Sequence, residues 1–415
     1  MISKKILIIG GGAAGLLCAI TAAEQGASPV ILERNPRPAR KVMITGKGRC
    51  NVTNNCSVQE LIASVPQNGR FLYSAFYQFT PQDMMDLLEN YGLPLKTERG
   101  NRVFPQSDKA VDVVDTLVRQ VKNARVPIRQ ERVTRLILED DQVLGAETEL
   151  GQKFFADAVV ICTGGASYPQ TGSTGDGYTL ARQAGHTVTP LRPSLIPFTS
   201  EDPMCKNMQG LSLRNIAVQL IQRANNKVLY EDFGEMLFTH FGVSGPVVLS
   251  ASSHLRDIRP GEYFLRIDLK PALTEEQLDL RLQRDFQKYS NHDFSNAFSE
   301  LLPQKMVPVF VRKTGIAPDW KVHQLTREMR QQVNFTMKHF DVPLSGFRPI
   351  EEAIITSGGV NVKEINPKTM ESKLVKGLYF AGEVLDVDAY TGGFNLQIAW
   401  STGRLAGKSA AEHEI

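Results

Sequence analysis

Cysteine is scarce in this 415-residue sequence, and its arrangement argues against two classes of protein. The five cysteines are odd in number and lack a C-x-x-C pair, so neither a disulfide scaffold nor a thiol relay of the usual spacing is expected. The seven histidines are scattered, and no His/Cys/Asp cluster has the spacing of metal ligands. We therefore predict no metal site, and buried structural thiols at Cys18 and Cys162.

The sequence also lacks a strong charge of either sign. The net charge is +3, and Lys and Arg are spread along the chain, so no nucleic-acid partner is predicted. Apart from residues 6–23, no uncharged run approaches the ~18–20 residues of a membrane span. We expect a cytoplasmic protein with a small-molecule substrate and no membrane partner. Nothing in the sequence predicts its oligomeric state.

The uncharged run at residues 6–23 has three interpretations. Lys4 and Lys5 precede it and small residues follow, which is roughly the layout of a secretion signal. Gly10-Gly11-Gly12 weakens that interpretation, because glycine disfavours the continuous helix of a signal by ~1 kcal/mol per residue. The other two interpretations are a strand-turn-helix that binds NAD and the anchor of the larger dinucleotide FAD.

A dinucleotide-binding unit explains the glycines. Residues 6–9 are a short β-branched run, which predicts a strand buried on both faces. Gly10, Gly12 and Gly15 follow at the G-x-G-x-x-G spacing. The first glycine allows a tight turn, the second lets the backbone approach a pyrophosphate, and the third lets the helix pack closely on the strand.

The residues after the glycines complete this unit. A helix is predicted from about Ala13 to Gln25, and its N-terminal amides and dipole face the phosphates. A second strand, Pro29 to Leu32, leads into Glu33, whose carboxylate can accept hydrogen bonds from ribose hydroxyls. A dinucleotide therefore binds here, as NAD or as FAD.

The rest of the chain indicates a dinucleotide domain interrupted by an insert. The first segment, 1–190, includes a small strand meander and a helix capped by Ser107 or Asp108. Prolines then cluster, and a β-rich insert is predicted at 191–273, followed by a helical insert at 274–345. Residues 346–415 return to the dinucleotide domain with a strand and a last helix.

The C-terminal segment favours FAD over NAD, because the ribityl and isoalloxazine half of FAD needs a second set of contacts. Gly382 lets the backbone approach the cofactor, and Glu383 and Asp386 can accept hydrogen bonds from ribityl hydroxyls or phosphate-bound water. Gly393 leads into a helix whose amides, at residues 395–397, can point at the flavin C2 carbonyl, where negative charge develops on reduction. Taken alone, the segment could instead be a strand-loop-helix that only caps the sheet.

Seven motifs together resemble those of the bacterial YhiN-like family of NAD(P)/FAD-dependent oxidoreductases, some of whose members are named aminoacetone oxidase or flavin-dependent reductase. The motifs are GGGAAG, GKGRCNVTN, NRVFPQSDKA, TGGASYPQTGSTGDGY, LFTHFGVSGP, TSGGVNV and GLYFAGEVLDVDAYTGGFNLQIAWSTG. This resemblance covers essentially the whole chain. It implies an α/β fold, a glutathione-reductase-type Rossmann FAD domain with an inserted β-barrel-like part and a small helical part.

The same resemblance implies which residues hold the cofactor. The glycine turn and Glu33 would bind the ADP half, and Val133 would face adenine through its backbone. The pyrophosphate and flavin side would be lined by Lys41 with Arg49, Cys50 and Asn51. One departure is Lys47, where the family often has glycine, and its longer side chain could alter access to the flavin edge. The residues predicted to bind FAD are Gly10, Gly12, Ala13, Ala14, Gly15, Glu33, Arg34, Lys41, Gly48, Arg49, Cys50, Asn51, Val133, Thr163, Gly164, Gly165, Gly382, Glu383, Asp386, Gly393, Asn395, Leu396 and Gln397.

Because a flavin performs the electron transfer, the protein need only place a substrate and manage protons. Three residues are candidates for catalysis, namely His240, Tyr168 and Tyr390. An unperturbed imidazole titrates near pH ~6.5, which suits a proton donor. The alternative for His240 is a packing or hydrogen-bonding role, and the alternative for the tyrosines is plain stacking in a pocket wall.

The predicted function is that of an FAD-dependent oxidoreductase acting on a small organic substrate in a cleft between the FAD domain and the insert. Reduction of an activated C=C bond and oxidation of an amine or C–H bond both stay open. No second G-x-G-x-x-G follows a strand, so NADH or NADPH is considered only as a transiently docking reductant. An FAD-dependent RNA-modifying enzyme, which the near-neutral charge disfavours, and a non-catalytic flavin sensor are the alternatives.

Overall fold

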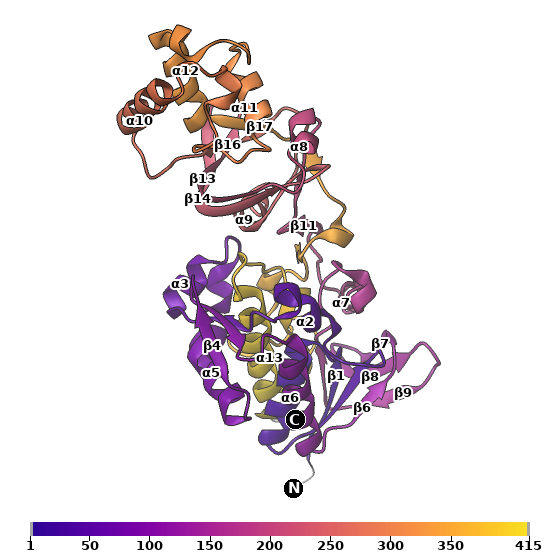
Figure 1. Ribbon diagram of the computed structural model, residues 1–415. Helices are drawn as coiled ribbons and strands as arrows, with labels where there is room; N and C mark the ends of the chain where they lie inside the picture. Colours follow the sequence, from indigo (N-terminus) through magenta and orange to yellow (C-terminus); the bar gives the residue numbers. More distant parts are fainter. Residues whose placement is uncertain (1–2, 413–415) are drawn as a thin grey trace. The chain divides into compact units, whose positions relative to one another are not determined.

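The computed structural model describes residues 3–412 of the chain, which divide into two compact units (Figure 1). The first unit contains the described residues up to Ser194 and those from Ile350 onward, and the second contains Leu195–Pro349. Each unit has a hydrophobic core of its own. The first unit is therefore built from both ends of the chain, and the second is inserted between them.

A five-stranded parallel sheet organises the first unit, in the order β20-β10-β1-β2-β6. Every pairing in this sheet is parallel, and the central strands are almost wholly buried, as expected for a parallel sheet covered on both faces. The strands are β1 (Lys5–Ile9), β2 (Ser28–Glu33), β6 (Ile128–Gln130), β10 (Ala158–Ile161) and β20 (Leu378–Phe380).

Two helices from opposite ends of the chain pack closely in this unit, α1 (Ala13–Glu24) and α13 (Phe394–Glu412). Their backbones approach each other so closely that a Cβ at Gly403 would collide with the Ala14 carbonyl. A Cβ at Gly407 would collide with the Cys18 carbonyl in the same way. Glycine at two positions one helical turn apart therefore fixes the α1–α13 contact.

The remaining elements of the first unit surround this framework (Figure 1). They include a β3-β5-β4 sheet and a β7-β8-β9 sheet. Their bounds are α2 (Arg40–Ile44), β3 (Thr53–Asn54), α3 (Val58–Ala63), α4 (Tyr73–Gln78), α5 (Pro81–Asn90), β4 (Leu95–Glu98), β5 (Arg102–Pro105), α6 (Ala110–Asn123), β7 (Val133–Glu139), β8 (Gln142–Thr148), β9 (Lys153–Phe155) and α7 (Asp176–Gln183).

The prediction that Ser107 or Asp108 caps α6 is wrong. Lys109 is the N-cap residue, and its own side chain makes no capping hydrogen bond. Among residues 3–412, the Ser107 hydroxyl accepts only from the Lys109 amide, at 3.4 Å, and not from an amide of the first helical turn. Asp108 has left-handed backbone (φ 57°), and its carboxylate is bound by Arg49 and Lys96 instead. The local pattern predicts that the Asp108 side chain caps the helix, but ion pairs with other parts of the chain hold it instead.

The second unit is built on a seven-stranded antiparallel sheet in the order β17-β16-β13-β14-β15-β12-β18. Its helices share one core with the sheet, and the last two strands follow the helices in sequence. The elements are β12 (Phe198–Thr199), α8 (Pro203–Asn207), β13 (Ser212–Gln222), β14 (Lys227–Phe238), β15 (Gly242–Ser244), α9 (Pro246–Ser252), β16 (Tyr263–Asp268), α10 (Glu275–Lys288), α11 (Val307–Thr314), α12 (Arg327–Lys338), β17 (Phe340–Pro343) and β18 (Gly346–Phe347).

The two chain crossings between the units run beside a small ribbon in the first unit. Strand β11 (Arg192–Ser194) pairs antiparallel with β19 (Ile355–Ser357), and Ser194 lies opposite Ile355. Leu195, the next residue, is buried and has left-handed backbone with φ 53°. Within residues 3–412, no helix is both long and apolar enough to span a membrane.

Candidate functional site

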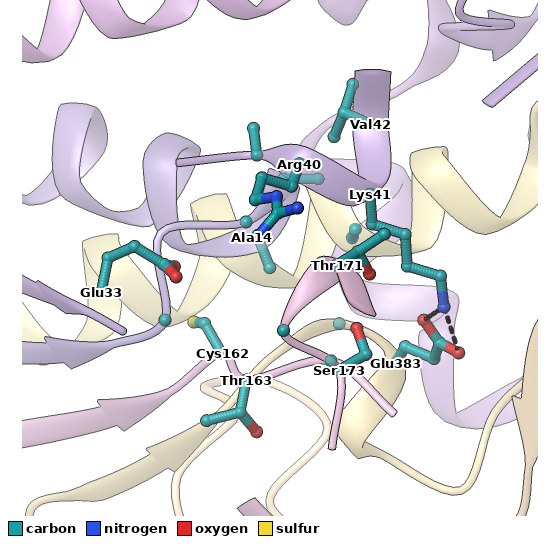
Figure 2. A pocket seen from close by; sticks show the side chains of 18 of the residues that line it. Ala14, Glu33, Arg40, Lys41, Val42, Cys162, Thr163, Thr171, Ser173 and Glu383 are labelled. Carbon is teal, nitrogen blue, oxygen red and sulfur yellow. Dashed lines mark hydrogen bonds and ion pairs between the residues drawn. The ribbon is translucent and has the colours of Figure 1, made fainter. Parts of the chain in front are cut away.

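A pocket lies at the carboxyl ends of β1, β2, β10 and β20, and all its lining residues belong to the first unit (Figure 2). The carboxyl edge of a doubly wound sheet is where such folds bind their ligands. The predicted cofactor-binding residues that line the pocket are Gly10, Gly12, Ala13, Ala14, Glu33, Arg34, Lys41, Val133, Thr163, Gly164, Gly382, Glu383, Asn395 and Leu396.

The glycine turn shapes the floor of the pocket. Gly10 has φ 102°, and a Cβ there would lie 2.5 Å from the Cys162 carbonyl oxygen. A Cβ at Gly15 would collide with the Gly10 carbonyl, so α1 can start this close to β1 only with glycine. At Gly12 a Cβ would meet no described atom within 4 Å, because this position faces the open pocket. The turn is thus tightly packed on its protein side and open on its ligand side.

Glu33 lies at the end of β2 and is buried. Its Oε2 accepts a hydrogen bond from the Gly11 amide at 2.7 Å, and its Oε1 accepts from the amide and side chain of Asn35, each at 2.8 Å. An ionised carboxylate has about four lone-pair positions, so acceptor capacity is left on Oε2. The carboxylate is therefore held in place and can still accept a ribose hydroxyl.

Lys41 and Glu383 form an ion pair in the pocket wall, with 2.7 Å between Nζ and Oε2 (Figure 2). The Lys41 ammonium also donates to Ser167 Oγ at 2.7 Å, and Glu383 Oε1 accepts from the Thr356 amide at 2.9 Å. Lys41 comes from α2 and Glu383 from the short turn η8 (Gly382–Val384). The pair therefore joins segments more than three hundred residues apart in sequence.

Two arginines and an aspartate lie at another part of the lining. Arg132 binds Asp176 with Nε 3.0 Å from Oδ2, and Arg34 binds the same oxygen at 3.2 Å. Burial acts to raise the pKa of Asp176, but hydrogen bonds from Arg132 and Thr174 and the nearby positive charges leave it lowered. Arg132 and Asp176 line the pocket without having been predicted to, and so do Arg40, Thr45, Glu131, Thr171, Ser173, Ile354, Ile355 and Ala399.

Arg49 was predicted to lie on the pyrophosphate and flavin side, but it is outside the lining. Its guanidinium binds Glu98 at 2.5 Å and Asp108 at 2.5 Å, and it lies 4.0 Å from the centre of the Phe104 ring. Lys96 binds the other carboxylate oxygen of Asp108, Oδ2, at 2.6 Å. This Arg49 cluster, formed by Arg49, Lys96, Glu98, Phe104 and Asp108, uses the positive charge of Arg49 within the protein.

The other predicted cofactor residues also lie outside the lining. Gln397 is fully buried, where it accepts from Thr53 at 2.7 Å and donates to the Phe79 carbonyl at 3.1 Å. Cys50 is buried too, and burial raises the pKa of its thiol to about 12. The remaining predicted residues in this group are Gly15, Gly48, Asn51, Gly165, Asp386 and Gly393.

The structure places the three catalytic candidates in different settings, and none of them is among the described residues that line the pocket. Tyr168 has left-handed backbone (φ 51°) and directly follows Ser167, the partner of Lys41. The Tyr390 amide donates to the Ser64 carbonyl at 3.0 Å. His240 is exposed in the second unit, where its ring packs edge-on against Phe241.

The pocket fits FAD. The open face at Gly12 lets the first amides of α1 approach a pyrophosphate, and a glycine N-cap leaves those amides without a side-chain acceptor from the cap itself. Glu33 offers a ribose acceptor, and the lining continues to Asn395 and Leu396 at the start of α13. Within residues 3–412, no group of three or more His, Cys, Asp or Glu side chains could hold a metal ion.

Known proteins resemble this chain over nearly its whole length. The family described as HI0933-like protein Rossmann domain matches residues 4–409. A ribosomal RNA dihydrouridine synthase of Escherichia coli is 34% identical over 396 residues, which cover 95% of each chain. A 3-dehydro-bile acid delta(4,6)-reductase of Clostridium scindens is 32% identical over 415 residues, which cover 99% of each chain.

A solved structure shares the fold at low sequence identity. The 3-ketosteroid-delta4-(5alpha)-dehydrogenase of Rhodococcus jostii, solved with 4-androstene-3,17-dione, aligns with a TM-score of 0.55 and 16% identity. The alignment covers 99% of this chain and 97% of that one. It confirms the predicted α/β architecture with a Rossmann-type domain.

Proposed function

The chain belongs to the HI0933-like family of FAD-dependent oxidoreductases, and from this premise we propose that it is a reductase of C=C bonds conjugated to a carbonyl group. We propose a small carbonyl compound as its substrate and NADH or NADPH as the source of electrons. The overall reaction adds a hydride and a proton across the double bond while NAD(P)H becomes NAD(P)⁺.

The observation that carries this proposal is the chemistry shared by the names of two relatives. Dihydrouridine is a uridine whose ring C=C bond, conjugated to a carbonyl, is saturated, and one relative is named as its synthase. The other relative is named as a reductase of a 3-dehydro-bile acid at positions 4 and 6, where double bonds are conjugated to a 3-keto group. Both names describe hydrogen addition to an electron-poor C=C bond.

When bound, FAD supplies the two-electron transfer of such a reaction. The protein contributes the placement of the cofactor. The amides at the start of α1 and the Glu33 carboxylate would hold the ADP half, and Asn395 and Leu396 would contact the flavin half. The Lys41–Glu383 ion pair joins two segments of the pocket wall and carries no net charge.

The second carbon of the double bond must receive a proton, and we propose Tyr168 as the donor. Its strained backbone and its position beside Ser167 support this choice, because strained residues cluster at functional sites. Tyr390 and His240 are the other two candidates. A Tyr168→Phe change at the proton donor should slow substrate reduction by on the order of 10²–10⁴-fold and leave flavin reduction by NAD(P)H unchanged.

A second candidate substrate is a uridine in ribosomal RNA. The specific observation in its favour is that relatives from both Escherichia coli and Haemophilus influenzae, at 34% and 32% identity, are named ribosomal RNA dihydrouridine synthase. The net charge of +3 counts against it, because RNA-binding surfaces are usually strongly basic. The reaction would be the same, so one experiment can separate the two substrates.

The experiment is an anaerobic visible spectrum of the purified protein with FAD. NADH or NADPH is added first, and the expected result is loss of the flavin absorbance. A 3-keto-Δ4 steroid, its saturated analogue as the matched control, or an unmodified ribosomal RNA transcript is then added, and return of the absorbance identifies the acceptor. Recovery with the unsaturated ketone alone supports the lead proposal, and recovery with the transcript alone favours the RNA substrate.

Two results would contradict the proposal. If neither nicotinamide nucleotide bleaches the flavin but an amine does, the enzyme works in the oxidising direction. If the flavin is bleached but no conjugated acceptor restores it, reduction of C=C bonds is not its chemistry.

A further inference from the structure

Asp388 is a buried carboxylate that binds both strands of the ribbon where the chain crosses between the units. Asp388 is only 4% exposed to solvent. Its Oδ2 accepts from the hydroxyl of Ser194 on β11 at 2.7 Å, and its Oδ1 accepts from the hydroxyl of Ser357 on β19 at 3.0 Å. One side chain therefore fastens the outgoing and the returning segments of the chain.

The ribbon is also bonded to the pocket wall on its other side. The Thr356 amide donates to Glu383, which lines the pocket and pairs with Lys41. The Thr356 hydroxyl accepts from the amides of Ala166 and Ser167, at 2.8 and 3.1 Å. In strand β19, Thr356 therefore contacts Glu383 in the pocket wall, and the next residue, Ser357, contacts Asp388.

Asp388 belongs to the segment that leads into α13 and the flavin half of the lining. Asn395, which lines the pocket, holds the residue after Asp388 by two bonds, because its side chain accepts from the Ala389 amide and donates to the Ala389 carbonyl, each at 2.8 Å. Because Asn395 holds the residue next to Asp388, a movement of Asp388 would also move Asn395.

The charge of Asp388 carries a cost that a purely structural residue would avoid. Burial raises its pKa, the hydrogen bonds from Ser194 and Ser357 lower it, and the neighbouring carboxylates of Asp386 and Glu383 raise it, so the pKa stays above its ordinary value. An asparagine would fit the same space without this cost. The charged groups on the elements around it are Asp386 and Glu383 on its own segment, Arg192 on β11, and Glu351 and Glu352 in the exposed turn beside β11.

We propose that Asp388 is a positioning residue, whose carboxylate ties the β11–β19 ribbon to the segment before α13 and so holds the flavin half of the pocket in its binding geometry. The ionised form accepts both serine hydroxyls at once. A neutral side chain has a donor in place of one acceptor, so one serine hydroxyl must turn to accept, and both bonds lose the strength that the ionised carboxylate gives them. The tie between the ribbon and the pocket wall is then weaker.

This inference rests on the cofactor pocket and on the proposed reductase function, and the first measurement requires no turnover. The variant is Asp388→Asn, and the readout is the dissociation constant of FAD, followed by flavin fluorescence from pH 8 down to pH 4, close to the ordinary aspartate pKa of 3.8. We expect FAD affinity at neutral pH to fall by on the order of tenfold, within the usual range of coupling between sites. Wild-type affinity should fall toward that of the variant as the pH is lowered, and the variant should be nearly independent of pH in this range.

Matched variants separate positioning from stability. Asp285→Asn removes another buried aspartate, one that pairs with Arg281 in the second unit, and should lower the melting temperature without changing FAD affinity. Ser194→Ala and Ser357→Ala each remove one donor and carry the same test if Asp388→Asn fails to fold. Unchanged FAD affinity and an unchanged pH profile in Asp388→Asn would overturn the inference.

The rate of flavin reduction by NAD(P)H gives the second readout. A slower reduction in Asp388→Asn at saturating FAD supports positioning of the flavin, and an unchanged rate limits the role of Asp388 to cofactor affinity, against the proposal. If wild-type protein is not reduced by NAD(P)H at all, the proposed function fails, while the affinity measurement still decides the role of Asp388.

Discussion

Two glycine-containing loops of the first unit hold unusual backbone conformations by different means. The turn at residues 10–15 is held by contact of backbone on backbone, since a Cβ at Gly15 would strike the Gly10 carbonyl. The loop at residues 46–50 has left-handed backbone at Gly46, Lys47, Gly48 and Cys50, and the Arg49 cluster fastens it. The conformation of the first loop depends on the small volume of its glycines, whereas that of the second depends on ion pairs between charged side chains.

The difference follows from what each loop presents. The turn at residues 10–15 offers its amides to a ligand, and charged side chains there would compete for the phosphates. The loop at residues 46–50 lies outside the lining, so its arginine can bind two carboxylates without reducing the space for the cofactor. Substitutions that change side-chain volume, side-chain charge or backbone conformation, and changes of pH, should therefore affect the two loops differently.

The largest effect should come from Gly15→Ala. The added methyl collides with backbone that has no room to move, and overpacking of this kind costs about 3 kcal/mol. We expect a large loss of apo-protein stability in a thermal melt, together with loss of bound FAD.

Gly12→Ala is the matched control, because a Cβ there faces open pocket and its φ of −79° suits any residue. Apo-protein stability should stay unchanged, while FAD affinity falls roughly 5- to 150-fold, the equivalent of about 1–3 kcal/mol. Equal destabilisation of the apo protein by the two variants would contradict the packing asymmetry described above.

Arg49→Met should have a smaller and salt-sensitive effect. It leaves Glu98 and Asp108 with Lys96 as their only cation in the Arg49 cluster, and we expect a lower melting temperature at low salt. At 1 M salt the Debye length is about 3 Å, so the difference from wild type should shrink. Arg37→Met, at an exposed pair with Asp115, is the control and should have little effect at either salt concentration.

The difference in stability between wild type and Arg49→Met should also depend on pH. Hydrogen bonds from Arg49 lower the pKa of Glu98, and those from Lys96 and Arg49 lower the pKa of Asp108, below the ordinary values of 4.5 and 3.8. A carboxyl group whose pKa is lower in the folded state than in the unfolded state stabilises the fold at pH values above its unfolded-state pKa. This contribution is lost as the pH falls through its folded-state pKa. The gap in stability between wild type and Arg49→Met should be full above about pH 5 and should shrink as the pH falls below the ordinary values of 4.5 and 3.8. A gap that widens on acidification would show that charge does not hold the loop.

The smallest effect is expected for Lys47→Gly. Lys47 is exposed with φ 58° and ψ 41°, a left-handed conformation that costs a side-chain-bearing residue about 1–2 kcal/mol. Glycine removes this strain but loses more entropy on folding, so a net gain of roughly 0.5–1 kcal/mol is expected. Lys47→Ala, which keeps the strain, should show no gain in the same thermal melt.

The sequence predicts those parts of the site that local rules specify. The strand at residues 5–9, the helix from Ala13 and the strand that ends at Glu33 all lie where the glycine spacing places them. Each depends on neighbours within a few residues, as periodicity and glycine chemistry require. The family and the FAD cofactor are confirmed for the same reason, because their motifs are short and contiguous.

The rest depends on contacts that no local pattern encodes. Arg49 binds carboxylates 49 and 59 residues away, and Arg132 reaches the pocket through Asp176, 44 residues further along the chain. Gln397 sits where a helix start predicts a cofactor contact, yet its amide is used by Thr53 and Phe79 in the core. Spacing alone cannot show whether a polar side chain faces a ligand or satisfies a buried partner.

The β11–β19 ribbon has a further consequence for how such a protein can change over evolution. Ser194 and Ile355 are paired across the ribbon, so the segment between them begins and ends at neighbouring points of its host. A loop whose ends already meet can be lengthened or exchanged at little entropic cost, since closure entropy grows only with the logarithm of its length. The cofactor domain can therefore keep its sheet and pocket intact while the inserted unit diversifies.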